Sequence, residues 1–161
     1  MSDNQINYLE WLLENAQIRV GARAIIINSE SDHFLVEKNL ETRDQYLNFI
    51  GGGIELGETL EACIEREMQE ETNAQVARME YLFVVENFIE FRGETLHGLG
   101  HYYEVEIDRN EVQSYLDGIE LVWLSIDELA QADLRPHIVR DFIADGSYRS
   151  VRHLISRDNV A

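Results

Sequence analysis

Three glutamates in the segment 51–74 have the type and the spacing that could hold a metal ion. The segment reads GGGIELGETLEACIEREMQEETNA, and it contains Glu67, Glu70 and Glu71 at positions i, i+3 and i+4 of a helix predicted over residues 59–72. This spacing places all three carboxylates on one face, where like charges repel unless a counter-charge is present. Hard divalent ions such as Mg²⁺ prefer oxygen ligands and bridge to phosphates. The cluster therefore indicates either a metal site or the solvated face of an acidic helix.

The remainder of the segment is suited to present this face to a cleft. Thr59 precedes the predicted helix as an N-cap residue. A second, apolar stripe can pack against a sheet, and it consists of Leu60, Cys63, Ile64 and Met68. The glycines at 51–53 allow the backbone to turn sharply and to approach a ligand closely.

Taken as a whole, the segment resembles the Nudix box, G-x5-E-x7-R-E-U-x-E-E-x-G-U, in which U is a bulky apolar residue. The matching positions are Gly52, Glu58, Arg66, Glu67, Met68, Glu70 and Glu71. A chance match anywhere in a chain this acidic has a probability on the order of 10⁻⁴. Two positions depart from the motif: Asn73 replaces the glycine and Ala74 replaces the last apolar residue. We expect Asn73 to cap the helix in the left-handed region, so that Asn73→Gly would be neutral or slightly stabilising.

The resemblance implies an α/β/α sandwich built on a mixed sheet and a metal-dependent hydrolase. Such an enzyme would cleave a phosphoanhydride bond in a nucleoside diphosphate linked to another group. By position, Glu67, Glu70 and Glu71 become the catalytic metal ligands for Mg²⁺ or Mn²⁺, with the carbonyl oxygen of Gly51 as a further ligand. Glu58 and Arg66 become a structural pair that holds the loop against the helix. The alternatives are a catalytically silent Nudix-fold module that binds nucleotides or regulates, and a purely structural acidic domain.

Four residues outside the motif are candidates for contact with the substrate. Arg23 lies on a predicted strand, on the same face as Arg19, and would contact a phosphate or an acid. Phe49 could stack on a base or pack in the core. Glu94 and Glu120 compete with Glu67 for the role of general base, although an ordinary surface role is open for both. The substrate itself stays open among nucleoside triphosphates, nucleotide sugars and dinucleotide polyphosphates.

The length of the chain, without an internal repeat or a Pro/Gly-rich linker, predicts one domain over residues 1–161. Expected strands cover residues 18–28, 34–37, 46–50, 79–91, 98–107 and 119–124. Besides the 59–72 helix, we expect helices within 1–16, at 125–131 and at 134–144, where Pro136 falls in the first turn, and a C-terminal tail over 145–161. Strands that alternate with helices predict an α/β fold with helices on the faces of a mixed sheet.

Composition limits the partners. The chain carries 13 basic and 31 acidic residues, a net charge of −18. This charge argues against a nucleic-acid polymer and against an anionic membrane surface as partners, whereas a small nucleotide could bind through bridging cations. Cys63 is the single cysteine, which excludes an intrachain disulfide. The N-terminus lacks the features of a signal peptide, so we expect a cytoplasmic protein, and the sequence leaves a homodimer open.

Overall fold

A computed structural model describes residues 18–28, 30–41, 46–91 and 93–159 of the chain. The helix expected within residues 1–16 lies outside these ranges. No helix in the described ranges is long and apolar enough to cross a membrane.

One mixed sheet of nine strands forms the centre of the fold. Its strands run in the order β8-β3-β2-β1-β6-β5-β9, while β4 pairs with β1 and β7 pairs with β2. The strands are β1 (Arg19–Asn28), β2 (His33–Asn39), β3 (Leu47–Asn48), β4 (Ile50–Gly53), β5 (Val76–Phe91), β6 (Glu94–Ile107), β7 (Ile119–Ser125), β8 (Leu134–Arg135) and β9 (His153–Asn159). Strands β5 and β6 form a long hairpin in which Phe91 pairs with Glu94, and β1 lies parallel to β6.

Strand β1 changes its antiparallel partner halfway along. Its second half pairs with β2, as in the register Ile26↔Leu35, whereas its first half pairs with β4, as in Arg23↔Gly51. The change of partner falls between Ala24 and Ile26, so the glycines of the motif lie beside the first half of β1.

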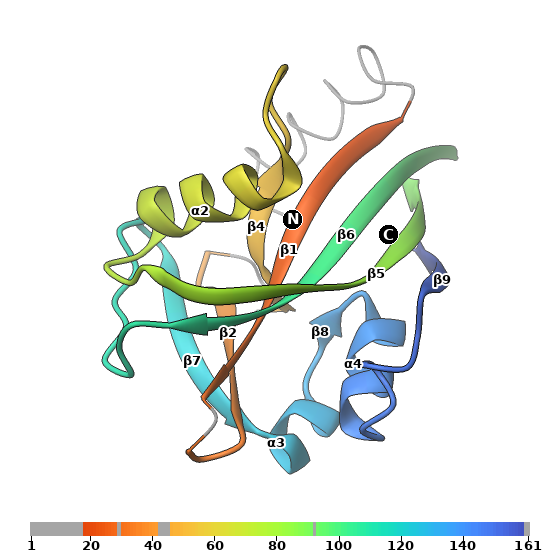
Figure 1. Cartoon of the computed structure of the whole chain (residues 1–161). Coiled ribbons are helices and arrows are strands. Elements are labelled where there is room, and N and C mark those ends of the chain that lie inside the picture. Colours follow the sequence, from red (N-terminus) through yellow and green to blue (C-terminus); the bar gives the residue numbers. More distant parts are fainter. Residues whose placement is uncertain (1–17, 29, 42–45, 92, 160–161) are drawn as a thin grey trace.

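In the described ranges, helices α2, α3 and α4 cover the two faces of the sheet, as Figure 1 shows. Helix α2 (Leu60–Glu71) packs on one face, where its side chains join Ala22, Ala24 and Ile26 of β1 in one core cluster. Helices α3 (Ile126–Gln131) and α4 (His137–Ala144) pack on the other face, in a second cluster around Phe83. The expected α/β/α sandwich on a mixed sheet is confirmed.

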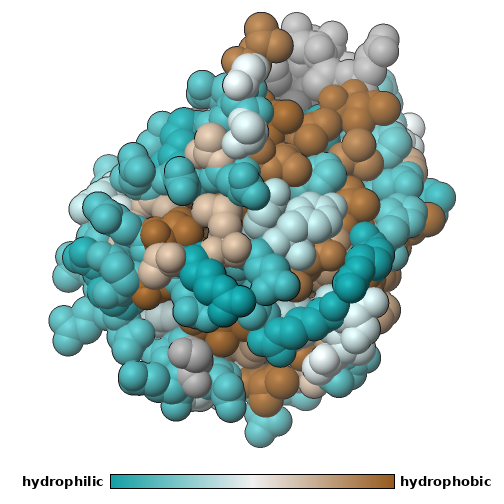
Figure 2. Space-filling model, viewed as in Figure 1, coloured by the Kyte–Doolittle hydropathy of each residue, from teal (hydrophilic) through white to brown (hydrophobic). Residues whose placement is uncertain are grey.

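Helix α2 begins and packs as the sequence predicts. The Thr59 hydroxyl accepts a hydrogen bond from the amide of Ala62 at 3.1 Å, which caps the first turn. Cys63, Ile64 and Met68 are buried in the core. The outward side of the helix is hydrophilic (Figure 2).

Two of the expected boundaries at the C-terminal end are wrong. The helix expected over 134–144 begins only at His137, because Pro136 has extended dihedral angles and residues before a proline disfavour the helical region. The preceding Leu134 and Arg135 form β8. The expected tail contains β9, which pairs in parallel with β5. Its pairing depends on a partner more than sixty residues away in the chain, which no local pattern indicates.

The expected left-handed cap at Asn73 is also wrong. Asp32 is the only non-glycine residue with positive φ in the described part of the chain, and the C-cap residue Thr72 is extended. The Asn73 side chain is used instead: its Oδ1 accepts a hydrogen bond from the amide of Gln113 at 2.8 Å, and its Nδ2 donates to the Glu111 carbonyl at 3.5 Å. Asparagine therefore joins the end of α2 to the 108–118 segment, which glycine could not do.

Candidate active site

The motif residues come together where α2 lies over β4 and the first half of β1. Register pairs Ala22↔Gly52 and Arg23↔Gly51 place the glycines directly beside β1. A Cβ at Gly52 would overlap the Glu67 carboxylate. Glycine at this position is thus what allows a helix carboxylate to reach the strand backbone.

Arg66 joins the loop before α2 to the helix. Its Nε and Nη2 donate to the two carboxylate oxygens of Glu58 at 2.8 and 3.0 Å, and Nη2 also donates to the Gly53 carbonyl at 3.1 Å. The Arg66 guanidinium, together with the amide of Glu55, lowers the pKa of Glu58 to about 2. The structural pair that the resemblance implies is present as a two-bond ion pair.

The first two glutamates of the cluster differ in exposure. The Glu67 side chain is 13% exposed, and its Oε1 accepts a hydrogen bond from Arg66 Nη1 at 2.8 Å. The same Nη1 lies 3.3 Å from Glu70, whose side chain is 59% exposed. Arg66 therefore orients Glu67 closely, while Glu70 faces solvent and can rotate.

Glu71 is partly buried, and it lies against a residue that the motif does not include. That residue is Glu37 on β2, and its carboxyl group contacts the Glu71 carboxyl. Burial raises the pKa of both groups, and repulsion from Glu37 and Glu67 raises the pKa of Glu71 further. The sequence pattern did not indicate Glu37 as a site residue. One feature of the sequence could have indicated it: Glu37 is a charged residue two positions after buried Leu35, and so lies on the same face of the strand.

Two arginines on β1 border these carboxylates. Arg23 acts electrostatically on both Glu37 and Glu71, and its Nη1 donates to the Ala22 carbonyl at 3.1 Å. Arg19, four residues earlier and on the same face of the strand, reaches toward Gly53, where a Cβ would approach its guanidinium. Burial and the neighbouring charge of Arg23 lower the pKa of Arg19. Two crowded cations beside an acidic cluster suit a ligand that carries phosphates.

The donor set fits a hard divalent cation. Oε1 of Glu37 and Oε2 of Glu71 are buried without a hydrogen-bond partner among the described residues. Unpartnered buried oxygens are costly, and a cation would satisfy them. Across the described ranges, no three His, Cys, Asp or Glu side chains already converge as a metal cage. Flexible side chains such as that of Glu70 would have to rotate to complete one.

The other three candidate substrate contacts lie apart from this cluster. Phe49 is 3% exposed and packs edge-on against Tyr102, so it is a core residue. Glu94 is the first residue of β6. Tyr103 of the same strand packs in the core cluster beneath α2, and Glu94 lies roughly 30 Å from it along the strand. Glu120 is exposed. The next residue of β7, Leu121, pairs with Glu37 of β2, so Leu121 and Glu37 lie on the same face of the sheet. Alternation therefore directs Glu120 to the opposite face from Glu37.

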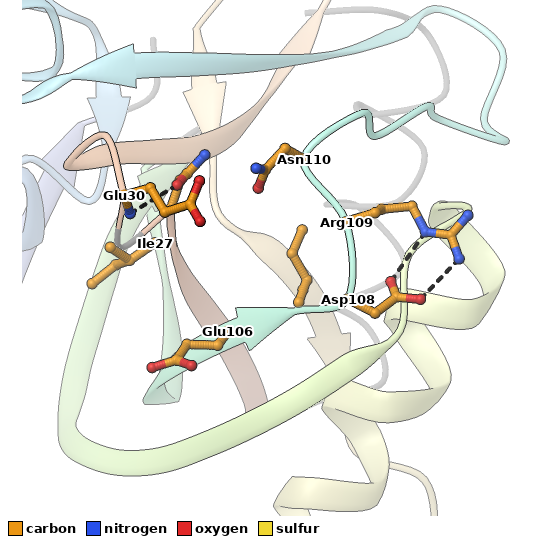
Figure 3. Close-up of a pocket in the computed structure, with 8 residues that line it drawn as sticks. Ile27, Glu30, Glu106, Asp108, Arg109 and Asn110 are labelled. Atoms are coloured by element: carbon orange, nitrogen blue, oxygen red, sulfur yellow. Dashed lines mark hydrogen bonds and ion pairs between the residues drawn. The ribbon is translucent and has the colours of Figure 1, made fainter.

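A shallow pocket lies at the other end of β1 (Figure 3). It is lined by Ile27, Asn28, Glu30 and the segment 106–110. Arg109 on its rim is held by Asp108 at 2.8 Å, and the pocket contains none of the motif residues. It is therefore separate from the candidate active site.

Known proteins resemble this chain over much of its length. The chain is 33% identical to the NAD-capped RNA hydrolase NudC of Photobacterium profundum over 82 residues, which is 50% of this chain and 31% of that protein. It is 26% identical to NudC of Pseudomonas aeruginosa over 131 residues, which is 78% of this chain and 45% of that protein. The matched region thus spans less than half the length of these relatives.

Solved structures share the fold. The MutT protein from Bacillus halodurans superposes with a TM-score of 0.67 at 19% identity, covering 89% of this chain and 90% of that one. A Nudix hydrolase from Nitrosomonas europaea gives a TM-score of 0.65 at 21% identity, covering 83% and 90%. The family model for the NUDIX domain matches residues 17–145. The motif, the fold and this match, which covers most of the chain, show that it belongs to the NUDIX family of hydrolases.

Proposed function

We propose that the protein hydrolyses a pyrophosphate bond in a nucleoside diphosphate linked to another group, and that it needs Mg²⁺ or Mn²⁺. The observation that carries the proposal is the intact carboxylate set of α2. Glu67, Glu70 and Glu71 are all retained, and Glu71 has a buried oxygen that lacks a partner in the described part of the chain. A helix face built only for solvent would not bury that oxygen at such a cost.

The residues that would hold the cation are Glu67, Glu70, Glu71 and the carbonyl oxygen of Gly51. When bound, the ion would neutralise phosphate charge and polarise the phosphoryl oxygens. Glu67 is the proposed general base, since Arg66 fixes its Oε1 while the side chain keeps 13% of its surface exposed. Glu58 supports this arrangement indirectly, through its two bonds to Arg66.

Arg23, with Arg19 beside it, would bind the phosphates of the substrate. Both lie on the same face of β1, next to the carboxylates. Guanidinium groups bind phosphate oxygens in a bidentate manner and stay charged when partly buried. Their placement would hold the diphosphate beside the acidic cluster.

The rival function is a nucleotide-binding module without activity. Such a module has no need for the complete carboxylate set, and this set is present. The two functions separate in one experiment, because a silent module would bind nucleotide without turning it over.

The substrate panel should include dinucleotides that contain a diphosphate bond. The relatives named above are called NAD-capped RNA hydrolases, and NAD is itself a nucleoside diphosphate linked to a second nucleoside. The net charge of −18 favours the free dinucleotide over a capped RNA chain. The panel therefore holds NAD, ADP-ribose, a nucleotide sugar, diadenosine tetraphosphate, dGTP and a short NAD-capped RNA.

The test is product release from this panel with Mg²⁺ or Mn²⁺ and with a chelator. We expect cleavage of at least one member with cation and none with chelator. Turnover that survives chelation would overturn the metal dependence. Tight binding of a panel member with no product under any condition would favour the silent module.

A further inference from the structure

Glu37 is placed by the fold at the motif although it lies fifteen positions before Gly52. It belongs to β2, where Leu35 and Glu37 share a face. Leu35 is buried in the same cluster as Ile64 and Met68 of α2. One step further along this face, the side chain of Glu37 meets the last turn of the helix, at Glu71.

The contact between these two residues leaves buried polar atoms without protein partners. Oε1 of Glu37 and Oε2 of Glu71 are both inaccessible to solvent, and neither has a hydrogen-bond partner in the described ranges. Two adjacent carboxylates repel, and burial strengthens the repulsion. Arg23 supplies the nearby positive charge, but its Nη1 donates to a backbone carbonyl. The site as built therefore contains two buried carboxyl oxygens that no side chain in the described ranges satisfies.

We propose that Glu37 is a further carboxylate of the divalent-cation site and holds the ion together with Glu71. The inference rests on the proposed function, which supplies the cation, and extends it to a residue outside the motif. A hard ion accepts several carboxylate oxygens, and coordination would use the two oxygens that lack protein partners. The site would then be assembled from β2 as well as from the helix and the glycine loop.

A purely structural role for Glu37 predicts something different. In that case Glu37 would only pack beside Glu71, and replacing it with the isosteric glutamine would not change cation binding. Direct measurement of cation affinity, without any substrate, therefore distinguishes the two roles independently of catalysis.

The experiment is Mn²⁺ titration by calorimetry and by electron paramagnetic resonance on the full chain, with wild type, Glu37→Gln and Glu65→Gln. Glu65 is an exposed residue of the same helix, so its variant removes the same charge from the outer side. We expect Mn²⁺ binding to Glu37→Gln to weaken by on the order of tenfold or more, while Glu65→Gln binds like wild type. A dissociation constant within twofold of wild type for Glu37→Gln would overturn the inference.

Two further readouts keep the result interpretable. Glu37→Asp retains the charge but shortens the side chain, and we expect an affinity between those of wild type and Glu37→Gln. Metal-free melting temperatures should be unchanged or raised for Glu37→Gln, which checks that the variant folds. If wild type itself binds no Mn²⁺, with or without a nucleotide, the proposed function fails. If wild type binds Mn²⁺ and the Glu37 variants bind it equally well, the assignment of Glu37 fails alone.

Discussion

Arg66 of α2 donates hydrogen bonds to both carboxylate oxygens of Glu58, at 2.8 and 3.0 Å, and so fixes the loop before the helix to the helix itself. The same guanidinium holds Glu67 and the carbonyl of Gly53. One cation thus sets the position of the loop, the glycine turn and a proposed catalytic carboxylate.

We expect Arg66→Lys to lower cation-dependent turnover by about 10- to 100-fold, because an ammonium group cannot reproduce the forked geometry and Glu67 would lose its fixed orientation. Steady-state kinetics on the best substrate of the panel would measure this. The matched control is Arg78→Lys, since Arg78 pairs with Glu80 on an exposed part of β5. Equal activity in Arg66→Lys and wild type would show that the forked hydrogen bonds of Arg66 are not needed for turnover.

Gly52→Ala tests whether the glycine turn makes room for Glu67. The added Cβ would overlap the Glu67 carboxylate, whose flexible side chain can move away. We therefore expect a loss of Mn²⁺ affinity of about tenfold or more with little change in melting temperature. At Gly98 an added Cβ would make only an ordinary contact, at 3.5 Å from the Arg19 carbonyl oxygen, so Gly98→Ala is the control. Unchanged affinity in Gly52→Ala would contradict the assigned position of Glu67.

Asn73→Gly should destabilise the protein, contrary to the expectation from the motif. The variant loses the hydrogen bond that Asn73 accepts from Gln113, and the backbone at 73 needs no positive φ that would reward glycine. We expect a loss of about 1–2 kcal/mol in the free energy of unfolding, measured with urea. Asn73→Asp keeps the acceptor oxygen and should retain most of the stability. A glycine variant as stable as wild type would mean that the hydrogen bond between Asn73 and Gln113 does not contribute to the free energy of unfolding.

The buried pair of Glu37 and Glu71 makes metal-free stability depend on pH. Because the pKa of each is raised in the folded state, to about 7 and about 9, the folded protein binds these protons more tightly than the unfolded chain. This stabilisation is complete below about pH 4.5 and is lost as pH rises through the folded values. With chelator present, the melting temperature should fall from pH 5 to pH 9, and the fall should be smaller in Glu37→Gln. An identical profile for both proteins would refute the coupling.

The sequence predicted the elements whose information is local. The 3.6-residue stripe of Cys63, Ile64 and Met68 predicts the buried side of α2, and Thr59 predicts its start. The motif also places Arg66 and Glu58 as a pair, because both positions belong to one short segment. These features depend on neighbours within about two helical turns or on the motif itself.

Other features depend on pairings between distant segments, and the sequence did not predict them. Strand β9 forms only against β5, and Glu37 reaches Glu71 only because β2 lies beneath the end of α2. Phe49 precedes the glycine turn, as a ligand-stacking residue would, but Tyr102 fills the space against its ring. Asn73 bonds to a segment forty positions away, which local helix-capping rules do not include.

The central claim is that the carboxylates of α2 support hydrolysis by holding a divalent cation, and Glu71→Gln tests it most directly. The variant keeps the size of the side chain, but this partly buried group can then neither ionise nor offer a carboxylate to a cation. Turnover with Mg²⁺ or Mn²⁺ is to be compared among wild type, Glu71→Gln and the outward-facing Glu65→Gln, with metal-free melting temperatures recorded alongside. We predict that Glu71→Gln loses several orders of magnitude in rate while its metal-free form is at least as stable as wild type, and that Glu65→Gln behaves like wild type. A Glu71→Gln protein that keeps more than about a tenth of the wild-type rate, a barrier change under about 1.4 kcal/mol, would contradict the claim.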